Sequence, residues 1–216
     1  MDRYTPLYVN TSGKTCCVVG GGRVAERKIK GLLHAEAHIK VFSPEITSEL
    51  KQLHQDSRIE WIARSYRKGD LRGAFLVYAA TDHAEVNAQV VQEANDAGIL
   101  VNDAMSSENS AFITPSVVRR GRLSIAISTA GAGPAAAAEI RSTLEQQFGE
   151  EYETYIEFLH QMRIQVKSRV SSPRVRSILL RRLTEMNVLE DIRTGQFQWW
   201  TEEEIGDWIS RNQEER

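Results

Sequence analysis

The stretch GKTCCVVGGGRVAERKIKGLL, residues 13–33, predicts the fold of the first half of the chain. A short apolar run ends in three glycines, and an amphipathic helical pattern begins directly after them. Gly20, Gly22 and Ala25 match the G-x-G-x-x-G/A pattern of dinucleotide-binding domains, where small residues let a pyrophosphate approach the backbone. The helix N-terminus would then offer free N–H groups to the phosphates. A tight turn with no ligand is the alternative, because glycines also serve that purpose.

Short β-like runs alternate with helical patterns over the first hundred residues. We expect strands at 7–10, 15–20, 38–43, 59–64, 74–81 and 99–103. We expect helices at 24–33, 46–54 and 84–97. Strands that alternate with helices at these lengths indicate βαβ units, and therefore a Rossmann-like α/β fold with a parallel sheet.

The pattern changes after residue 110. Two further strands are expected within 110–120 and 122–129, joined by a hairpin turn at RRGR. Helices are then expected at 135–149, 151–170, 174–186 and 201–211, of which the second carries apolar residues at spacings of three and four. The sequence therefore predicts a nucleotide-binding domain, a linking hairpin and a helical C-terminal part.

Composition and charge exclude several classes of protein. The 216 residues carry a net charge of -2 and a pI near 6.2, so no global field would attract nucleic acid or an anionic membrane. No apolar run approaches the roughly 20 residues that span a bilayer, and the N-terminus lacks a signal-peptide core. Cys16 and Cys17 are adjacent and would point to opposite faces of a strand. We therefore expect a reduced, cytoplasmic protein. The five histidines show no metal-ligand spacing, so no metal site is expected.

The end of the second expected strand, VFSPE, is where a dinucleotide-binding domain holds the adenosine ribose. The usual carboxylate at the strand end is missing here. Glu45 comes two residues late, and the hydroxyl of Ser43 with the nearby backbone could serve instead. No arginine follows directly to bind a 2′-phosphate, which favours NAD over NADP. Thr81, in the run AATD at the end of the strand expected at 74–81, is a further expected cofactor contact.

Asp103, in ILVNDAMSS, is the candidate catalytic acid or base. It lies at the carboxyl end of an expected strand, where ligands bind in open α/β sheets. A carboxylate there could move a proton while a nicotinamide takes a hydride. A loop-capping aspartate is the alternative. Asn102 beside it could orient a ligand or close the turn.

The hairpin and the helical part are rich in arginine, with Arg119 and Arg120 foremost among the candidate substrate contacts. Forked guanidinium groups would suit a substrate with several carboxylates, although solvated helix faces would also explain them. The loop STAGAGP, residues 128–134, could present the hydroxyls of Ser128 and Thr129 to the same ligand, or could simply join strand to helix.

Several of these stretches together resemble one family. They are PLYVN, the glycine-turn stretch, VFSPE, YAATDHAEVNAQV, VNDA and SAFITPSVVRRGRLSIAISTAGAGP. In this order they are similar to the precorrin-2 dehydrogenases, the enzymes of sirohaem synthesis that also occur as the N-terminal part of sirohaem synthases. The likeness covers residues 5 to about 145, and the helical tail more loosely.

The resemblance implies NAD-dependent oxidation of precorrin-2 to sirohydrochlorin by an intertwined homodimer. It implies an NAD-binding Rossmann domain at 1–113, a dimerisation region at 114–148 and a helical domain at 149–216. Asp103 stands at the place of the family's important acidic residue, and Thr129, beside Ser128, stands where the synthases have a serine associated with substrate control. The implied nucleotide contacts are Arg23, Val24, Pro44 and Glu45.

Three alternatives remain open at this point. The chain could combine the dehydrogenase with a sirohydrochlorin ferrochelatase. It could be a non-catalytic NAD-sensing module, which would need the glycine turn but neither Asp103 nor the arginines. A nucleic-acid binder using residues 171–182 is the third, although apolar residues interleave there at helical spacing, as in a packing helix.

Overall fold

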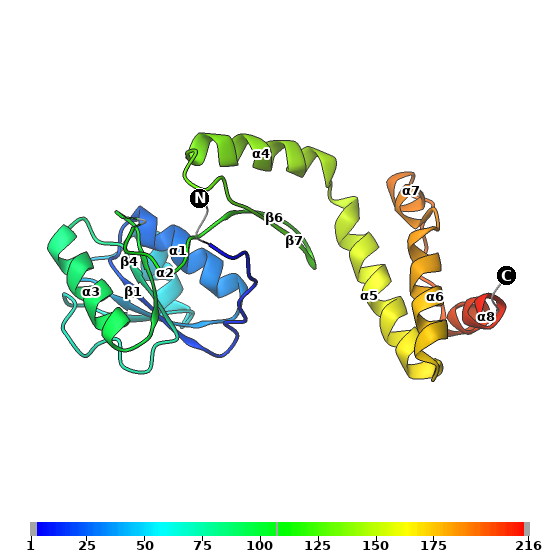
Figure 1. The fold of residues 1–216 in the computed structure, drawn as a ribbon, viewed down its shortest axis with the longest axis horizontal. Helices are drawn as coiled ribbons and strands as arrows, with labels where there is room; N and C mark the ends of the chain where they lie inside the picture. The colour runs from blue at the N-terminus through cyan, green and yellow to red at the C-terminus, as the bar shows by residue number, and fades with distance from the viewer. Residues whose placement is uncertain (1–3, 107, 214–216) are drawn as a thin grey trace. The chain divides into compact units, whose positions relative to one another are not determined.

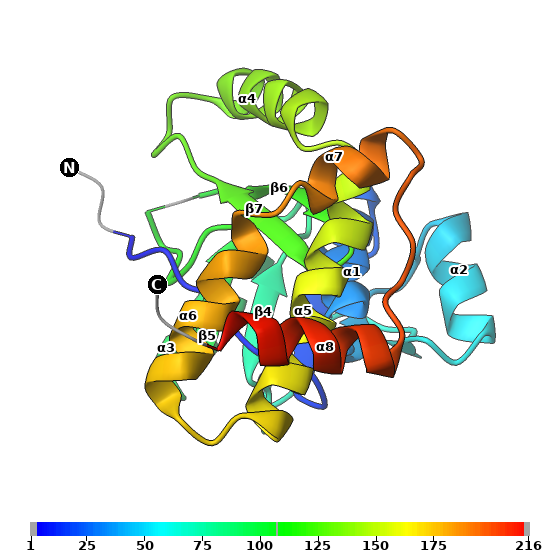
Figure 2. The ribbon, with the colours of Figure 1, turned by 90° about the vertical axis from the view of Figure 1, so that its right-hand side faces the viewer.

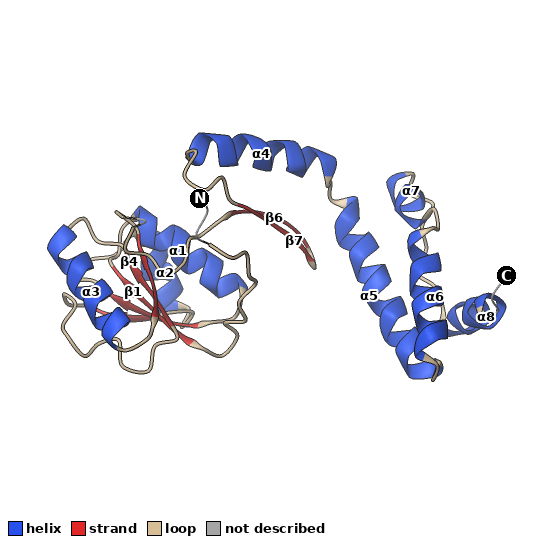
Figure 3. Ribbon diagram, in the orientation of Figure 1, coloured by secondary structure: helices blue, strands red, loops and turns tan. Residues whose placement is uncertain are grey.

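The computed structural model describes residues 4–106 and 108–213. The chain forms two compact units, Met1–Thr114 and Pro115–Arg216. The first unit mixes strands and helices, and the second is mainly helical (Figure 3).

The first unit is built on a parallel five-stranded sheet in the order β3-β2-β1-β4-β5. Figure 1 shows this sheet, with β1 and β4 labelled, between helices of the same unit. Its strands are β1 (Thr15–Val19), β2 (His38–Phe42), β3 (Glu60–Ile62), β4 (Leu76–Ala79) and β5 (Leu100–Asp103). Its helices are α1 (Arg23–His34), α2 (Ser48–Gln55) and α3 (Ala84–Asp96). The strand order reverses between β1 and β4, as in dinucleotide-binding sheets. The predicted Rossmann-like α/β fold is confirmed.

The central strand β1 is buried on both faces, which explains why the run CCVV is apolar throughout. Cys16 packs on the face covered by α1, together with Ile29. Cys17 packs on the opposite face with Val90 of α3. Both cysteines are free thiols, and burial raises the pKa of Cys16 to about 11 and that of Cys17 to about 12. The two cysteines therefore serve as small apolar core residues.

The strand expected at 7–10 is absent, and this prediction was wrong. The segment is irregular, and the side chains of Leu7, Tyr8 and Val9 are exposed. A run of large apolar residues resembles a strand in sequence, but it forms a strand only where a neighbouring edge offers hydrogen bonds and burial. Residues 110–115 are likewise irregular, and the strand expected there begins only at Ser116.

The second unit begins with an antiparallel hairpin and continues as helices. Its elements are β6 (Ser116–Arg120), β7 (Leu123–Ile127), α4 (Pro134–Gln147), α5 (Glu151–Arg169), α6 (Pro173–Thr184), α7 (Val188–Arg193) and α8 (Glu202–Asn212). The short helix α7 was not predicted. Phe158, Met162 and Val166 of α5 form the core with α6 and α8, and α8 lies across α5 (Figure 2).

The start and end signals of these helices are local. Ser172 caps α6 by accepting a hydrogen bond from the Val175 N–H, with Pro173 at the first helical position. Thr201 and Glu204 form a capping box at the start of α8. In contrast, α4 buries none of its residues within the chain.

Candidate functional site

The carboxyl ends of four strands form the edge at which the candidate site lies. Val19 of β1 is level with Phe42 of β2 on one side and with Ala79 of β4 on the other. Ala79 is in turn level with Asp103 of β5. Neighbouring strands lie about 4.8 Å apart, so Asp103 is two strands, or roughly 10 Å, from the end of β1. The predicted cofactor and acidic residues therefore share one edge of the sheet.

Two glycines hold the β1–α1 turn against its neighbours. Gly20 has φ +119°, and a Cβ there would lie 2.3 Å from the Ala80 carbonyl oxygen. A Cβ on Gly21 would lie 2.1 Å from the Glu45 carbonyl oxygen, in the loop after β2. Both contacts are closer than any real Cβ allows, so neither position can carry a side chain without movement. Sequence reasoning missed Gly21, because the motif treats that position as variable.

Gly22 differs from its two neighbours. A Cβ at Gly22 would meet nothing within 4 Å, so there is open space in front of the start of α1. Gly22 is the N-cap of α1 and makes no side-chain capping bond. The first helical bond runs from the Glu26 N–H to the Gly22 carbonyl, which leaves the preceding N–H groups, including those of Arg23 and Val24, without a helical partner. Open space and free N–H groups at a helix N-terminus suit a pyrophosphate.

The turn after β2 is held by Ser43. Its hydroxyl donates to the Glu45 carbonyl at 2.6 Å, and the Trp61 indole N–H donates to the Ser43 carbonyl at 2.9 Å. Ser43 is buried, whereas Pro44 and Glu45 are exposed. The hydroxyl of Ser43 therefore shapes the turn, and Glu45 is the accessible acid of this turn.

Thr81 follows β4 and organises the start of α3. Its hydroxyl lies 2.7 Å from Asn87 Oδ1 as donor, and the Asn87 amide nitrogen donates to the Thr81 carbonyl at 3.2 Å. The backbone N–H of His83 donates to the same hydroxyl at 3.2 Å. Asn87, which sequence reasoning did not single out, is fully buried. Thr81 thus has structural contacts of its own, and its cofactor contact stays a prediction.

Asp103 lies at the end of β5 and is 8 % exposed. Its Oδ1 accepts a hydrogen bond from the Met105 N–H at 2.9 Å, and its own N–H donates to the Ser110 hydroxyl at 2.9 Å. The loop-capping contact considered for this residue therefore exists. An ionised carboxylate has about four acceptor positions on two oxygens, so one such bond leaves capacity for a proton or a ligand. Capping fixes Asp103 without excluding catalysis.

Asn102 points to the other face of β5 from Asp103. Its amide nitrogen donates to the Phe112 carbonyl at 2.9 Å, which ties down the segment leading to the second unit. Its Oδ1 is buried and has no hydrogen-bond partner among residues 4–106 and 108–213. The hydrogen bonds from Asn102 to Phe112 and from Asp103 to Ser110 were not predicted, because each of them spans a loop.

The other predicted substrate residues belong to the second unit. Arg120 packs against the end of α4, where its guanidinium donates to the Glu145 carbonyl at 3.2 Å and lies 3.3 Å from the Glu150 carboxylate. Arg119 is exposed on β6. The Ser128 hydroxyl accepts from the Ala130 N–H at 3.4 Å, within the loop before α4. Thr129 closes the same loop, with its hydroxyl 3.5 Å from the Gly133 carbonyl. Their role toward a substrate stays a prediction.

In the part of the chain that the structure describes, no group of three or more His, Cys, Asp or Glu residues could hold a metal ion. Nor does any described helix combine the length and the apolar character that crossing a bilayer requires.

Two family models match the chain. Residues 7–116 match a putative NAD(P)-binding family, and residues 120–147 match the central region of sirohaem biosynthesis proteins. The first match covers half of the chain, including the glycine turn and Asp103.

Curated relatives and a solved structure agree with these models. Siroheme synthase 1 of Aeromonas salmonicida is 40% identical over 169 residues, which are 78% of this chain and 36% of the relative. Siroheme synthase of Nitrosococcus oceani is 34% identical over 194 residues, 90% of this chain and 42% of the relative. The chain thus spans well under half the length of these synthases. A structure titled SirC, precorrin-2 dehydrogenase, superposes with a TM-score of 0.76 at 28% identity, covering 96% of this chain and 98% of that one.

Proposed function

The chain belongs to the NAD(P)-binding precorrin-2 dehydrogenase family of sirohaem biosynthesis, and we propose that it oxidises precorrin-2 to sirohydrochlorin with NAD+. One observation carries the proposal: a helix N-terminus suited to a pyrophosphate and a buried carboxylate lie at the same edge of one parallel sheet. A sensor that only binds a nucleotide would need the first feature and not the second.

The reaction removes two hydrogens from the macrocycle, one as hydride and one as a proton. A bound nicotinamide cofactor supplies the hydride acceptor. The chain must therefore hold the macrocycle carbon beside that acceptor and receive the proton. We assign the proton to the carboxylate of Asp103, which the Met105 N–H holds at the strand end.

The preference for NAD over NADP is part of the proposal. Glu45 is an exposed carboxylate in the loop after β2, where the ribose is expected, and its negative charge would oppose a 2′-phosphate while a 2′-hydroxyl could donate to it. The Gly21 backbone contact holds the Glu45 loop against the cofactor turn.

A homodimer formed through the hairpin and α4 also belongs to the proposal. Two strands alone are marginally stable in water, and α4 leaves Ile140 43% exposed while burying none of its own residues. A second copy would give both elements a partner. Sedimentation of the purified protein should give twice the mass of the chain, and a monomer at micromolar concentration would contradict the dimer.

A cytoplasmic location fits the two free, buried thiols.

The activity is tested by mixing purified protein with precorrin-2 and NAD+. Sirohydrochlorin should appear as a long-wavelength absorbance band, with one NADH formed for each macrocycle oxidised. NADH formation no faster than the rate without protein would overturn the dehydrogenase. Replacing NAD+ by NADP+ at equal concentration should slow the reaction, which tests the cofactor preference separately.

A further inference from the structure

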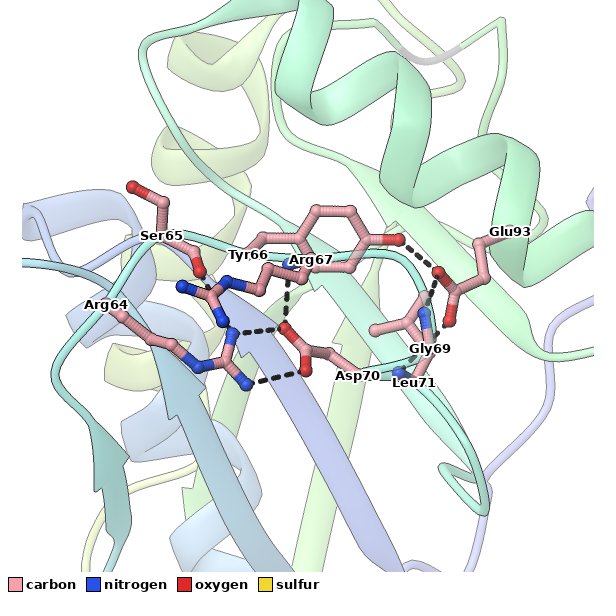
Figure 4. A network of polar contacts seen from close by, with 8 residues as sticks. All are labelled: Arg64, Ser65, Tyr66, Arg67, Gly69, Asp70, Leu71 and Glu93. Carbon is pink, nitrogen blue, oxygen red and sulfur yellow. Dashed lines mark hydrogen bonds and ion pairs between the residues drawn. The ribbon is translucent and has the colours of Figure 1, made fainter.

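The segment between β3 and β4 is closed by a network of polar contacts (Figure 4). At one end, Arg64 donates two hydrogen bonds to the carboxylate of Asp70, at 2.7 and 2.8 Å. The Arg67 N–H donates to the same carboxylate at 2.8 Å. These contacts give Asp70 a fixed orientation toward the guanidinium of Arg64.

At the other end of the network, Glu93 of α3 accepts hydrogen bonds from the backbone of the same segment. Its carboxylate accepts from the Gly69 N–H at 2.8 Å, from the Leu71 N–H at 3.2 Å and from the hydroxyl of Tyr66. Among the residues that the structure describes, Glu93 makes no hydrogen bond or ion pair with Arg64 or Asp70. It stabilises the loop without touching the ion pair, which makes it a matched control for that pair.

Arg64 lies beside the end of β2. It follows β3 by two residues, and its N–H donates to the Ile62 carbonyl, which also accepts from Ser43 N–H. Ile62 is level with Phe42, the last residue of β2, and the Arg64 guanidinium carbon lies 5.6 Å from the centre of the Phe42 ring. The end of this strand is where a dinucleotide-binding sheet holds the adenosine ribose. A distant segment thus supplies the cation that VFSPE lacks.

The charge of Arg64 is already balanced. Its side chain is 34% exposed and that of Asp70 is 12% exposed. The hydrogen bonds from Arg64 lower the pKa of Asp70, so both groups are charged near neutral pH. Arg64 Nη1 donates to Asp70 and to the Ser65 carbonyl, and Nη2 donates to Asp70. These bonds use three of the five guanidinium donors and leave two, the Nε–H and one Nη2 hydrogen.

We propose that Arg64 faces the 2′ position of the adenosine ribose and that Asp70 selects NAD over NADP by neutralising Arg64. The inference rests on the nicotinamide-cofactor site proposed above. A 2′-hydroxyl can accept a hydrogen bond from the Nε–H, one of the two remaining donors. A 2′-phosphate must compete with Asp70 for the guanidinium and meets a like charge there. Arg67 and Lys68 are exposed in the same segment, so removal of the Asp70 charge would leave it wholly cationic.

Calorimetric titration of the full chain with NAD+ and with NADP+ tests this inference without any turnover. Asp70→Asn should lower the Kd of NADP+ about tenfold and change that of NAD+ less than about threefold, because one carboxylate charge near a phosphate is removed. An unchanged ratio of the two constants in Asp70→Asn would overturn the inference and leave the proposed function standing. If the unmodified chain binds neither nucleotide, the proposed function itself fails.

Two further variants separate selectivity from loop stability. Glu93→Gln should lower the unfolding temperature while leaving the ratio of the two constants unchanged. A ratio that moves in Glu93→Gln as in Asp70→Asn would show that any loosening of the loop changes selectivity, and would overturn the specific role of Asp70. In Arg64→Met/Asp70→Asn, the gain in NADP+ affinity should disappear, because Asp70 acts through Arg64.

Should Asp70→Asn fail to fold in a thermal scan, Arg64→Lys carries the test. Lysine keeps a charge for Asp70 but has no Nε–H in the guanidinium position. We expect NAD+ affinity to fall about threefold, as for the loss of one hydrogen bond. Unchanged NAD+ affinity in Arg64→Lys would overturn the placement of Arg64 at the ribose.

Discussion

The two ends of the candidate site are built in opposite ways. At the β1–α1 turn, the absence of side chains brings Gly20 and Gly21 into contact with neighbouring backbone and leaves space beyond Gly22. At the end of β5, side chains bind neighbouring backbone N–H groups, with the Asp103 carboxylate on the Met105 N–H and the Ser110 hydroxyl on the Asp103 N–H. The first end can be changed only by adding atoms, and the second by altering one functional group. Substitutions in the turn should therefore impair cofactor binding or folding, whereas substitutions of Asp103 should impair turnover.

The largest effect is expected from Asp103→Asn. The amide oxygen can still accept from the Met105 N–H, so the loop should keep its shape. The amide cannot take up a proton, and turnover should fall by about 10² to 10⁴, the usual range for a lost general acid or base. Steady-state NADH formation measures the loss, and calorimetry should find NAD+ affinity unchanged. Normal turnover would leave Asp103 with its capping role alone.

Gly22→Asp should act on binding without harming the fold. The backbone at Gly22 has φ -83°, which any residue adopts, and an aspartate is a favoured N-cap. The added carboxylate would occupy the open space and repel a pyrophosphate, so we expect NAD+ affinity to fall about a hundredfold. Thermal unfolding should show equal or slightly higher stability. Retained affinity would mean that the phosphates lie elsewhere.

Gly21→Ala should do the reverse, affecting the fold before the chemistry. The added Cβ would overlap the Glu45 carbonyl, and relief of that overlap should cost about 2 kcal/mol of unfolding free energy. Urea denaturation measures this cost. Gly22→Ala, which adds the same methyl group to open space, is the matched control and should cost well under half as much. Equal losses in the two variants would contradict the close packing at Gly21.

The smallest effect is expected at Lys28 of α1, where the free energy of unfolding should depend on pH. Its ammonium donates to the Thr114 hydroxyl at 2.8 Å, and burial lowers its pKa from 10.5 to about 8. Between these values the unfolded chain holds the proton that the folded chain has released, so stability contributed by Lys28 rises with pH. Relative to Lys28→Met, the unmodified chain should gain on the order of 1 kcal/mol from pH 8 to 10.5, allowing for solvent exposure. Parallel curves in urea denaturation would contradict the lowered pKa.

The fold and the outline of the site were predictable because their signals are local. The run CCVV, the glycines and the helical pattern after them lie within residues 13–33, and together they predicted β1, the turn and α1. The prediction of a strand at 7–10 was wrong because a strand also needs a neighbouring strand to pair with, and the local sequence does not show whether one is available.

The contacts that refine the site were not predictable for a related reason. Gly21 acquires its constraint from Glu45, and Arg64 reaches Phe42 from another strand. VFSPE contains no arginine, and only the parallel pairing of β2 with β3 brings one beside it. Side-chain partners that depend on strand order follow from the fold and not from the local sequence.

The two buried cysteines of β1 allow opening of the sheet to be measured by thiol labelling. A thiol reagent attacks only an exposed thiolate, and burial at the centre of the sheet denies both conditions to Cys16 and Cys17. Their labelling rate should therefore measure how often the sheet opens. A ligand that binds only the closed sheet would slow that labelling in proportion to its occupancy. The labelling rate of these two cysteines thus measures ligand binding without a substrate and without an introduced probe residue.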